Sequence, residues 1–339
     1  MSKALFIFSY NDPAQIDRIL LDRIHRIRFD NLSIDDKQVI VRKYILPEIN
    51  RKMGLVDVIQ ISDEVIEYLI THYTFEPGVR KLKEILFDLF GEINLEILNC
   101  VDANGLQLPI AVSEADIGTR YLKKYDKVNE KKIHVRPEVG VINGLWASMY
   151  GKGGIIPIQT MFYLSNSFLD LKLTGMQGDV MKESMNVAKS LAWSLLSPVE
   201  QEALVAQFEK TKYQGLHIHC PEGAVSKDGP SAGTAITLAI LSLLKKMPIR
   251  NDVAITGEIT LQGNITEIGG LQDKILGGIK SGIRTFLYPT SNETDFQKFH
   301  EKYKDKKLLQ GVQFIPVANV QDTFQHVFVE GAVAKTKIQ

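Results

Sequence analysis

The sequence of 339 residues has few cysteines, no excess of charge and no long apolar run, and each absence excludes a class of protein. Cys100 and Cys220 are isolated, which argues against a disulfide-rich secreted fold and favours reduced thiols in the cytoplasm, with an organelle matrix as the other option. The 40 lysines and arginines balance the 40 aspartates and glutamates, so the charge predicts no binding to nucleic acid or to a membrane surface. We find no apolar segment long enough to span a bilayer and no signal peptide at Met1.

Two kinds of ligand-binding motif are also missing. The histidines show no metal-binding spacing beyond His217 and His219, and two ligands on one strand face are too few for a metal site, so we predict no metal. The G-x-x-x-x-G-K-[ST] loop that binds nucleotide phosphates does not occur. We therefore expect that this chain alone does not hydrolyse ATP.

Ser231 lies where a loop meets an apolar helix. The alternating residues 215–220 predict a strand, residues 221–229 a loop rich in Pro, Gly and Asp, and residues 232–244 a buried helix. Pro230 suits the first position of that helix because it has no N–H to lose there. A serine at a helix N-terminus lies beside unpaired backbone N–H groups, and we expect these amides, from Ser231 and from the residues just before Pro230, to form an oxyanion hole.

Lys274 is the candidate base for this serine. A serine hydroxyl becomes a good nucleophile only when a base removes its proton, and a lysine can do so only if burial lowers its pKa enough to leave it neutral near pH 7. Residues 271–281 predict a helix on which Lys274 shares a face with glycines, so another backbone can come close and exclude water. These glycines are Gly270, Gly277 and Gly278.

Other interpretations of these residues are open at this point. Thr256 ends an apolar strand. Either its hydroxyl orients the lysine amine, or Thr256 is an ordinary strand residue with no role in the site. Ser231 can be a simple helix cap in a non-enzymatic assembly or adaptor module. Residues 229–233 also fit G-x-S-x-G, the nucleophile elbow of α/β-hydrolases, with His300 or His326 completing a triad. That elbow needs a strand running straight into the serine, and the preceding residues are not strand-like.

Taken together, several segments resemble the Lon family of ATP-dependent proteases. They are residues 173–184, His217-Ile218-His219 ahead of Pro221-Glu222-Gly223-Ala224, residues 227–233, residues 256–261, and Gly269-Gly270-Leu271 with Lys274. The resemblance implies that His217 and His219 are the histidine pair on the strand below the active site.

The resemblance implies a role for each of the other site residues. Ser231 corresponds to the nucleophile, Lys274 to the general base and Thr256 to the hydroxyl partner of the lysine. Asp228 corresponds to the loop acid that pairs with the lysine and masks it when the site is off. The implied reaction is hydrolysis of peptide bonds through an acyl-enzyme, with the substrate extended beside a strand edge.

The resemblance extends upstream into an AAA+ ATPase module. Residues 4–10 resemble its sensor-1 strand, with Asn11 as the sensor, Arg23 corresponds to the arginine finger, and Arg80 to sensor 2 at the start of a helix. The resemblance implies unfolded or damaged proteins and peptides as substrates, a homo-oligomer, specifically a hexamer, and ATP with Mg²⁺ as cofactors of the full-length protein. It implies no cofactor for the protease domain.

The predicted fold class is α+β. A helical AAA+ lid subdomain, preceded by the last strand and helix of the AAA+ α/β core, is followed by an α+β Lon-type protease domain. The predicted boundaries are 1–30 for the end of the α/β subdomain, 31–122 for the lid, 123–136 for a linker, 137–331 for the protease domain and 332–339 for a tail. Helices are expected over 35–50, 62–71, 78–98, 113–122, 181–195 and 198–210.

One segment departs from the family pattern. Residues 144–154 read Gly-Leu-Trp-Ala-Ser-Met-Tyr-Gly-Lys-Gly-Gly, where the family usually has Gly-Leu-Ala-Trp-Thr before the Gly-Gly pair. We expect this longer hairpin to change the shape of the substrate groove and to leave the pair of Ser231 and Lys274 unaffected. Because the phosphate loop and the acidic magnesium-binding strand are missing, we expect the chain to be a piece of a longer protein that degrades peptides and unfolded chains weakly.

Overall fold

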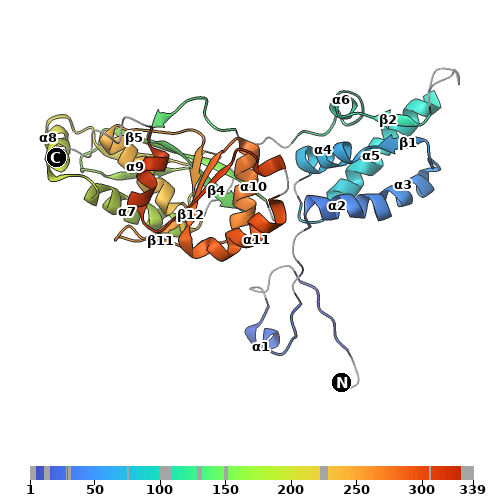
Figure 1. The fold of residues 1–339 in the computed structure, drawn as a ribbon, viewed down its shortest axis with the longest axis horizontal. Helices are drawn as coiled ribbons and strands as arrows, with labels where there is room; N and C mark the ends of the chain where they lie inside the picture. The colour runs from blue at the N-terminus through green and yellow to red at the C-terminus, as the bar shows by residue number, and fades with distance from the viewer. Residues whose placement is uncertain are drawn as a thin grey trace.

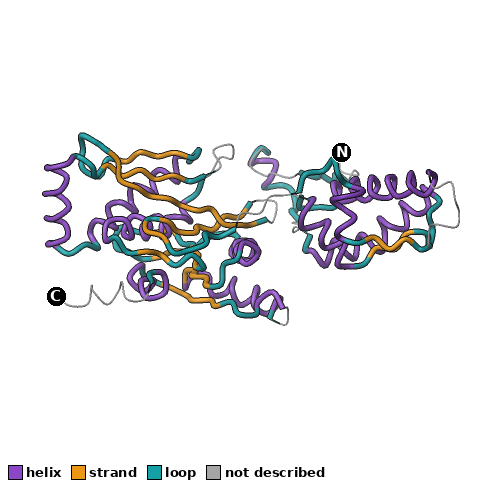
Figure 2. Tube along the Cα trace, turned by 90° about the horizontal axis from the view of Figure 1, so that it is seen from above, coloured by secondary structure: helices purple, strands orange, loops and turns teal. Residues whose placement is uncertain are grey.

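A computed structural model describes residues 5–10, 16–27, 29, 32–74, 76–99, 108–127, 132–148, 152–221, 228–304 and 307–329. These residues form a smaller helical body and a larger body that contains the main sheet (Figure 1). Figure 2 shows that most strands gather in the larger body, whereas the smaller one is built mainly of helices. The predicted α+β class is therefore confirmed, and the exact domain boundaries stay predictions.

The smaller body combines helices with a two-stranded parallel sheet. Its elements are α2 (Ile34–Ile40), a π-helical turn (Val41–Ile45), α3 (Leu46–Met53), β1 (Ile59–Ile61), α4 (Asp63–Tyr73), α5 (Arg80–Asn99), β2 (Ile110–Val112), α6 (Glu114–Asp116) and a second π-helical turn (Ile117–Tyr121). The helices predicted from the sequence in this region are confirmed. The two strands were missed because three residues are too few to show an alternating pattern.

Capping and apolar spacing explain these helices. The Ser33 hydroxyl accepts a hydrogen bond from the Asp36 amide at the start of α2, and the Ser62 hydroxyl does the same for Val65 in α4. On α5, apolar residues three and four positions apart form one buried stripe. These residues are Leu82, Ile85, Leu86, Leu89, Phe90 and Ile93. They pack with α2, α3 and α4 into a single core.

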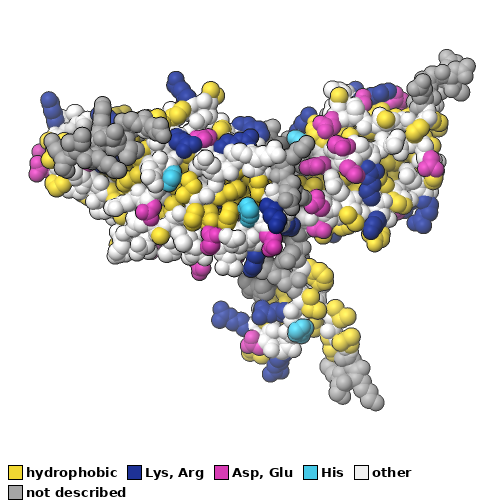
Figure 3. Space-filling model, in the orientation of Figure 1, with side chains coloured by type: hydrophobic (Ala, Val, Ile, Leu, Met, Phe, Trp, Pro, Cys, Tyr) yellow, Lys and Arg dark blue, Asp and Glu magenta, His cyan; other side chains and the backbone are white. Residues whose placement is uncertain are grey.

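The buried strand predicted for residues 4–10 is wrong for the part that the structure describes. Residues 5–10 have no regular structure, and the side chains of Leu5 and Ile7 are 87% and 85% exposed. They belong to an arm that leaves the smaller body and shows its apolar side chains to solvent (Figure 3). A strand needs a neighbour for its backbone N–H and C=O groups, and none of the described strands lies beside this segment. The predicted sensor, Asn11, lies outside the described residues.

The larger body alternates strands and helices. Its strands are β3 (Glu138–Val139), β4 (Val141–Ala147), β5 (Gly153–Tyr163), β6 (Leu171–Thr174), β7 (Gly215–His219), β8 (Pro248–Ile249), β9 (Val253–Ile255), β10 (Glu258–Ile259), β11 (Ile265–Thr266), β12 (Thr285–Pro289) and β13 (Gln313–Val317). Its helices are α7 (Asp179–Ser194), α8 (Pro198–Thr211), α9 (Gly233–Lys245), α10 (Leu271–Ser281), α11 (Glu293–Tyr303) and α12 (Phe324–Val327). The helices predicted over 181–195 and 198–210 are confirmed as α7 and α8.

The main sheet has seven strands in the order β13-β12-β9-β4-β5-β7-β6. The pairs β4–β5 and β5–β7 are antiparallel, and the other pairs are parallel. The central strands contribute side chains to two different cores: Ile142 and Leu145 of β4 lie in different clusters, as do the adjacent Ala254 and Ile255 of β9. The sheet is thus buried on both faces, which is why its central strands are almost wholly apolar.

Helices cover both faces of this sheet. Helices α7 and α9 pack together over one core, and α10 and α11 pack over the other. No helix among the described residues has both the length and the apolar composition needed to cross a bilayer. Ser231 precedes α9 and Lys274 lies on α10, so the two candidate site residues belong to the helical layers on opposite faces of the sheet.

Candidate active site

Ser231 lies in a 3-10 turn (Pro230–Ala232) that runs directly into α9. Its carbonyl oxygen accepts hydrogen bonds from the Gly257 amide at 2.9 Å and from the Thr256 hydroxyl at 3.2 Å. The Gly257 carbonyl in turn accepts bonds from the amide and the hydroxyl of Thr234 in the first turn of α9. The backbone around the serine is therefore fixed to the end of strand β9. The predicted position at a helix start is confirmed, with the 3-10 turn as an added element.

Lys274 lies in the first turn of α10 with only 3% of its surface exposed. Its Nζ donates a hydrogen bond to the Thr256 hydroxyl at 3.1 Å. Burial lowers the pKa of Lys274 from 10.5 to about 8, because the ammonium form loses more hydration than the neutral amine. No charged group among the described residues adds to this shift. The lysine is thus a buried amine without a counter-ion.

Glycines explain how this lysine loses its water. A Cβ added to Gly277 would lie 2.0 Å from the carbonyl carbon of Gly153, and a Cβ added to Gly153 would lie 2.0 Å from the carbonyl oxygen of Asp273. The start of β5 is therefore in direct backbone contact with α10, and a side chain at either glycine would separate them. The close backbone approach predicted from the glycine face of this helix is confirmed.

Thr256 joins the two candidate residues. It follows β9 directly, is completely buried, and its hydroxyl accepts from Lys274 while donating to the Ser231 carbonyl. Within the described residues no hydrogen bond connects the Ser231 hydroxyl to the Lys274 amine directly, so the link between them runs through this threonine. A hydroxyl is well suited to this position because it accepts one bond and donates another.

Asp228 is engaged with a different element from the one that the family resemblance implies. Its Oδ1 accepts hydrogen bonds from the amide of Met181, in the first turn of α7, and from the amide of Gly229, both at 3.0 Å. In the described structure it makes no bond to Lys274. The residue before α7 is Gly178, which has no side chain to cap the helix, and Asp228 supplies the cap from a distant loop. This role is not among those predicted from the sequence, where the lack of a capping side chain at Gly178 was the available signal.

His217 and His219 lie on one face of β7 and share a partner. The Thr174 hydroxyl lies 2.9 Å from Nε2 of His217 and 2.7 Å from Nδ1 of His219. Burial lowers the pKa of His217, and the nearby Lys172 and His219 act in the same direction. This shared contact joins β6 to β7 through Thr174, for which the sequence predicted no role of its own. The pair therefore fits a structural role that joins these two strands.

The remaining candidates lie apart from this cluster. Arg23 follows the single turn of α1 (Arg18–Leu21), Arg80 is the first residue of α5 as predicted, and both are exposed. His300 lies on α11 beside Phe296, and His326 lies on α12, and neither has a described contact with the serine. Strand β7 ends at His219, so no strand runs directly into Ser231, and the nucleophile elbow of α/β-hydrolases is not formed.

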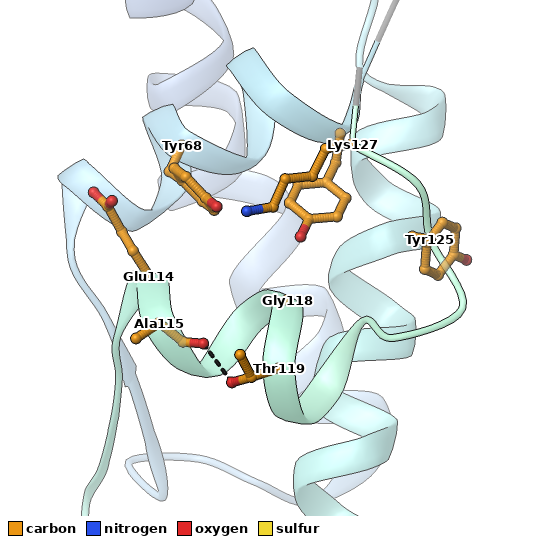
Figure 4. Close-up of a pocket in the computed structure, with 8 residues that line it drawn as sticks. Tyr68, Glu114, Ala115, Gly118, Thr119, Tyr125 and Lys127 are labelled. Atoms are coloured by element: carbon orange, nitrogen blue, oxygen red, sulfur yellow. Dashed lines mark hydrogen bonds between the residues drawn. The ribbon is translucent and has the colours of Figure 1, made fainter. Parts of the chain in front are cut away.

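A separate hollow of about 490 Å³ lies in the smaller body. It is lined by Tyr68, Tyr73, Glu114, Ala115, Gly118, Thr119, Tyr125 and Lys127. Tyr68 and Lys127 point toward one another inside it (Figure 4). None of its lining residues belongs to the cluster of Ser231, Thr256 and Lys274, so this hollow is not the candidate active site.

Comparison with known proteins matches both bodies to one family. Residues 115–330 match the model of the Lon protease (S16) C-terminal proteolytic domain, and residues 51–98 match the model of the Lon protease AAA+ ATPase lid domain. The chain is 33% identical over 329 residues to the Lon protease of Mycoplasmopsis agalactiae, covering 97% of this chain and 31% of that protein. It is 32% identical over 332 residues to the Lon protease of Clostridioides difficile, covering 97% and 40%.

A third relative gives the same picture. The Lon protease of Neorickettsia sennetsu is 34% identical over 334 residues, covering 97% of this chain and 38% of that protein. The chain therefore spans between 31% and 40% of the length of these relatives. A family model that covers most of the chain, together with relatives aligned over nearly all of it, shows that the chain belongs to the Lon protease family and contains a Lon-type protease domain.

Proposed function

We propose that this chain is a serine endopeptidase in which Ser231 is the nucleophile and Lys274 is the general base. The observation that carries the proposal is the state of the lysine. It is buried with no counter-ion among the described residues, its pKa is lowered to about 8, and its amine is held by the threonine that also binds the Ser231 carbonyl. A base with a pKa near the working pH is the kind that proton transfer requires.

The lowered pKa of Lys274 makes the difference between a usable and an unusable base. At about pH 7, a lysine with a pKa of about 8 is roughly one-tenth neutral, whereas a lysine at the ordinary value of 10.5 is neutral in roughly one molecule in three thousand. Burial therefore raises the population of the reactive amine by a factor of a few hundred, on the same scale. Without that gain the serine hydroxyl would have no effective proton acceptor.

The proposed reaction has two chemical stages. The serine hydroxyl turns toward the neutral Lys274 amine and gives up its proton as its oxygen attacks the scissile carbonyl. The amide of Ser231, at the start of α9, makes no hydrogen bond within the described residues and is the available donor for the oxyanion. The lysine ammonium then protonates the leaving amine, and water hydrolyses the acyl-enzyme with Lys274 again acting as base.

Covalent labelling combined with peptide cleavage tests this proposal. We expect Ser231→Ala to abolish both labelling by a fluorophosphonate and cleavage of an unfolded substrate such as casein. Lys274→Ala should abolish cleavage while leaving the fold intact by circular dichroism. Lys280→Ala, a change of the same type on the same helix, is the matched control and should retain activity. Cleavage that persists in either of the first two variants contradicts the dyad. Loss of cleavage in Ser231→Ala with retention in Lys274→Ala supports the Ser-His alternative, and failure of the fluorophosphonate to label Ser231 in the unchanged protein supports the adaptor.

The wider function is proposed from family membership. We expect the longer protein to be an ATP- and Mg²⁺-dependent hexamer in the cytoplasm or an organelle matrix, where it degrades unfolded or damaged proteins. Arg23 and Arg80 are exposed on separate elements, and the sequence has no phosphate loop, so we expect this chain alone to form no nucleotide site. Mixing the purified chain with ATP should release no phosphate, and phosphate release would overturn this expectation.

A further inference from the structure

Helix α10, which carries Lys274, is bound at its C-terminal end by residues that follow the smaller body along the chain. The amide of Ile133 donates to the Ser281 carbonyl at 3.2 Å, and Nζ of Lys132 donates to the Lys280 carbonyl at 2.7 Å. The last carbonyls of a helix have no partner within the helix, and a cation is favoured beside them. One end of α10 is thus tied to the chain that leaves the smaller body.

The other end of α10 is connected to the smaller body through Lys152. This residue lies in the hairpin between β4 and β5, in the segment where the sequence departs from the family pattern. Its Nζ donates a hydrogen bond to the carbonyl oxygen of Thr74, which ends α4 and is 1% exposed. A lysine ammonium at the C-terminus of a helix is favoured by the helix dipole. The contact therefore joins the two bodies at a buried backbone group.

The backbone of Lys152 is held firmly enough to transmit this contact. The Ser148 amide donates to the Lys152 carbonyl at 2.7 Å, and the Lys152 amide donates to the Ser148 hydroxyl at 3.4 Å. The next residue is Gly153, where an added Cβ would lie 2.0 Å from the Asp273 carbonyl oxygen and 2.8 Å from the Lys274 amide nitrogen. Backbones packed this closely cannot shift independently of one another. A movement of Lys152 must therefore move the contact that covers the first turn of α10.

We propose that Lys152 is a positioning residue that couples helix α4 to the burial of Lys274. The proposal rests on the function proposed above. When Lys152 is bound to Thr74, the start of β5 is pressed against α10 and water is kept from the Lys274 amine. When that bond is lost, the hairpin is free to separate from α10, water reaches the amine, and Lys274 stays protonated near pH 7, so fewer molecules carry the neutral amine that can accept the serine proton. The smaller body thereby acts on the reaction through the base.

The contacts around Lys274 indicate that this coupling acts by changing how much water reaches its amine. The amine is bonded to the Thr256 hydroxyl at the end of β9, and the β5 backbone packs on its helix. The carboxylate of Asp273 is its neighbour on α10, and the charged group that acts on Asp273 is Lys302 of α11. Burial lowers the pKa of Lys274, and no charge among the described residues contributes to this shift. A loss of packing should therefore raise that pKa directly.

The test is the pH dependence of Ser231 labelling by a fluorophosphonate. In Lys152→Met, which keeps the aliphatic stem but loses the donor, we expect the midpoint of the rate profile to rise by about one pH unit and the rate near pH 7 to fall roughly tenfold. Lys152→Arg restores a cationic donor and should return the midpoint to that of the unchanged protein. Lys189→Ala, on α7, a helix in the half of the larger body away from the smaller one (Figure 1), should leave the midpoint unchanged.

The outcomes separate failure of the coupling from failure of the proposed function. A Lys152→Met protein that labels with an unmoved midpoint shows that the residue has a merely structural role and refutes the coupling. If this variant folds poorly, rates are measured relative to the fraction of molecules that label, and Gly153→Ala, which forces β5 away from α10, must raise the midpoint in the same direction. A Gly153→Ala midpoint that does not move also refutes the coupling. Labelling that persists in Ser231→Ala instead refutes the proposed function itself.

Discussion

Replacing the buried lysine with methionine should make the protein more stable near neutral pH while destroying its catalysis. Lys274 is 3% exposed and the part of the chain that the structure describes gives it no counter-ion, so the folded protein must hold an ammonium group away from water. Lowering its pKa from 10.5 to about 8 corresponds to a cost on the order of 3 kcal/mol when the group is charged. Methionine has similar length and no charge, and the lost bond to Thr256 offsets about 1 kcal/mol, which leaves a net gain of about 2 kcal/mol.

The sign of the pH dependence follows from the direction of the shift. The pKa of Lys274 is lower in the folded protein than in the unfolded chain, so between about pH 8 and pH 10.5 the unfolded chain binds more protons. The stability of the unchanged protein therefore rises with pH across this window, as the burial cost disappears. Methionine does not titrate, so the advantage of Lys274→Met should be greatest below about pH 8 and should shrink above it.

The assay is denaturant unfolding of both proteins at about pH 7 and at about pH 9.5, values on either side of the folded pKa. Lys245→Met is the matched control, because Lys245 is also largely buried, with 8% of its side chain exposed, but its Nζ lies 3.0 Å from both carboxylate oxygens of Glu200. Removing a partner from this ion pair should lower stability by about 1 kcal/mol. A Lys274→Met protein that is less stable at neutral pH, or an advantage that does not change with pH, refutes the reasoning.

Three further predictions concern the threonine, the aspartate and the glycine face. In Thr256→Val the pKa of Lys274 should fall further, because the ammonium loses a hydrogen-bond acceptor. The midpoint of the pH–rate profile should therefore move down, and the plateau rate should fall roughly tenfold or more because the amine is no longer held in place. An unchanged plateau contradicts this prediction. Asp228→Ala should cost about 1 kcal/mol in urea unfolding by leaving the first turn of α7 uncapped, with Asp228→Asn close to the unchanged protein; equal stability of all three rules out the cap. In Gly277→Ala the added Cβ would lie 2.0 Å from the β5 backbone, so this variant should lose more than about 1 kcal/mol of stability. Gly91→Ala, whose Cβ would have nothing within 4 Å, should be neutral or stabilising by up to about 1 kcal/mol. Thermal unfolding that ranks the two variants the other way refutes the packing argument.

Local signals account for what the sequence predicted about the candidate site. Pro230 ahead of an apolar run marks the start of a helix, and the glycines around Lys274 mark a face that a second backbone can approach, so both helices could be placed from nearby residues. These signals also located Thr256 at the end of a strand, but the bond from Lys274 to its hydroxyl required the structure.

Contacts between residues far apart in the chain explain what the sequence did not predict. The bond from Asp228 to α7 and the bond from Lys152 to Thr74 join segments whose proximity no local pattern encodes. The same limit explains the wrong strand over residues 5–10, since an apolar run becomes a strand only when a neighbouring strand is present to pair with it. The parallel pair β1 and β2 was missed for the complementary reason, because it forms from two runs that are too short to show a period.

Helix α9, which follows Ser231 directly, is almost wholly buried. Every residue from Gly233 to Ser242 is buried, and the helix lies between the sheet and α7. Amide protons in such a segment exchange with solvent mainly through openings that approach complete unfolding, whereas exposed loops exchange through small local fluctuations. Ser231 is therefore attached to a segment that we expect to unfold only with the whole domain. Local fluctuations of the surrounding loops should leave its backbone hydrogen bond to Gly257 intact.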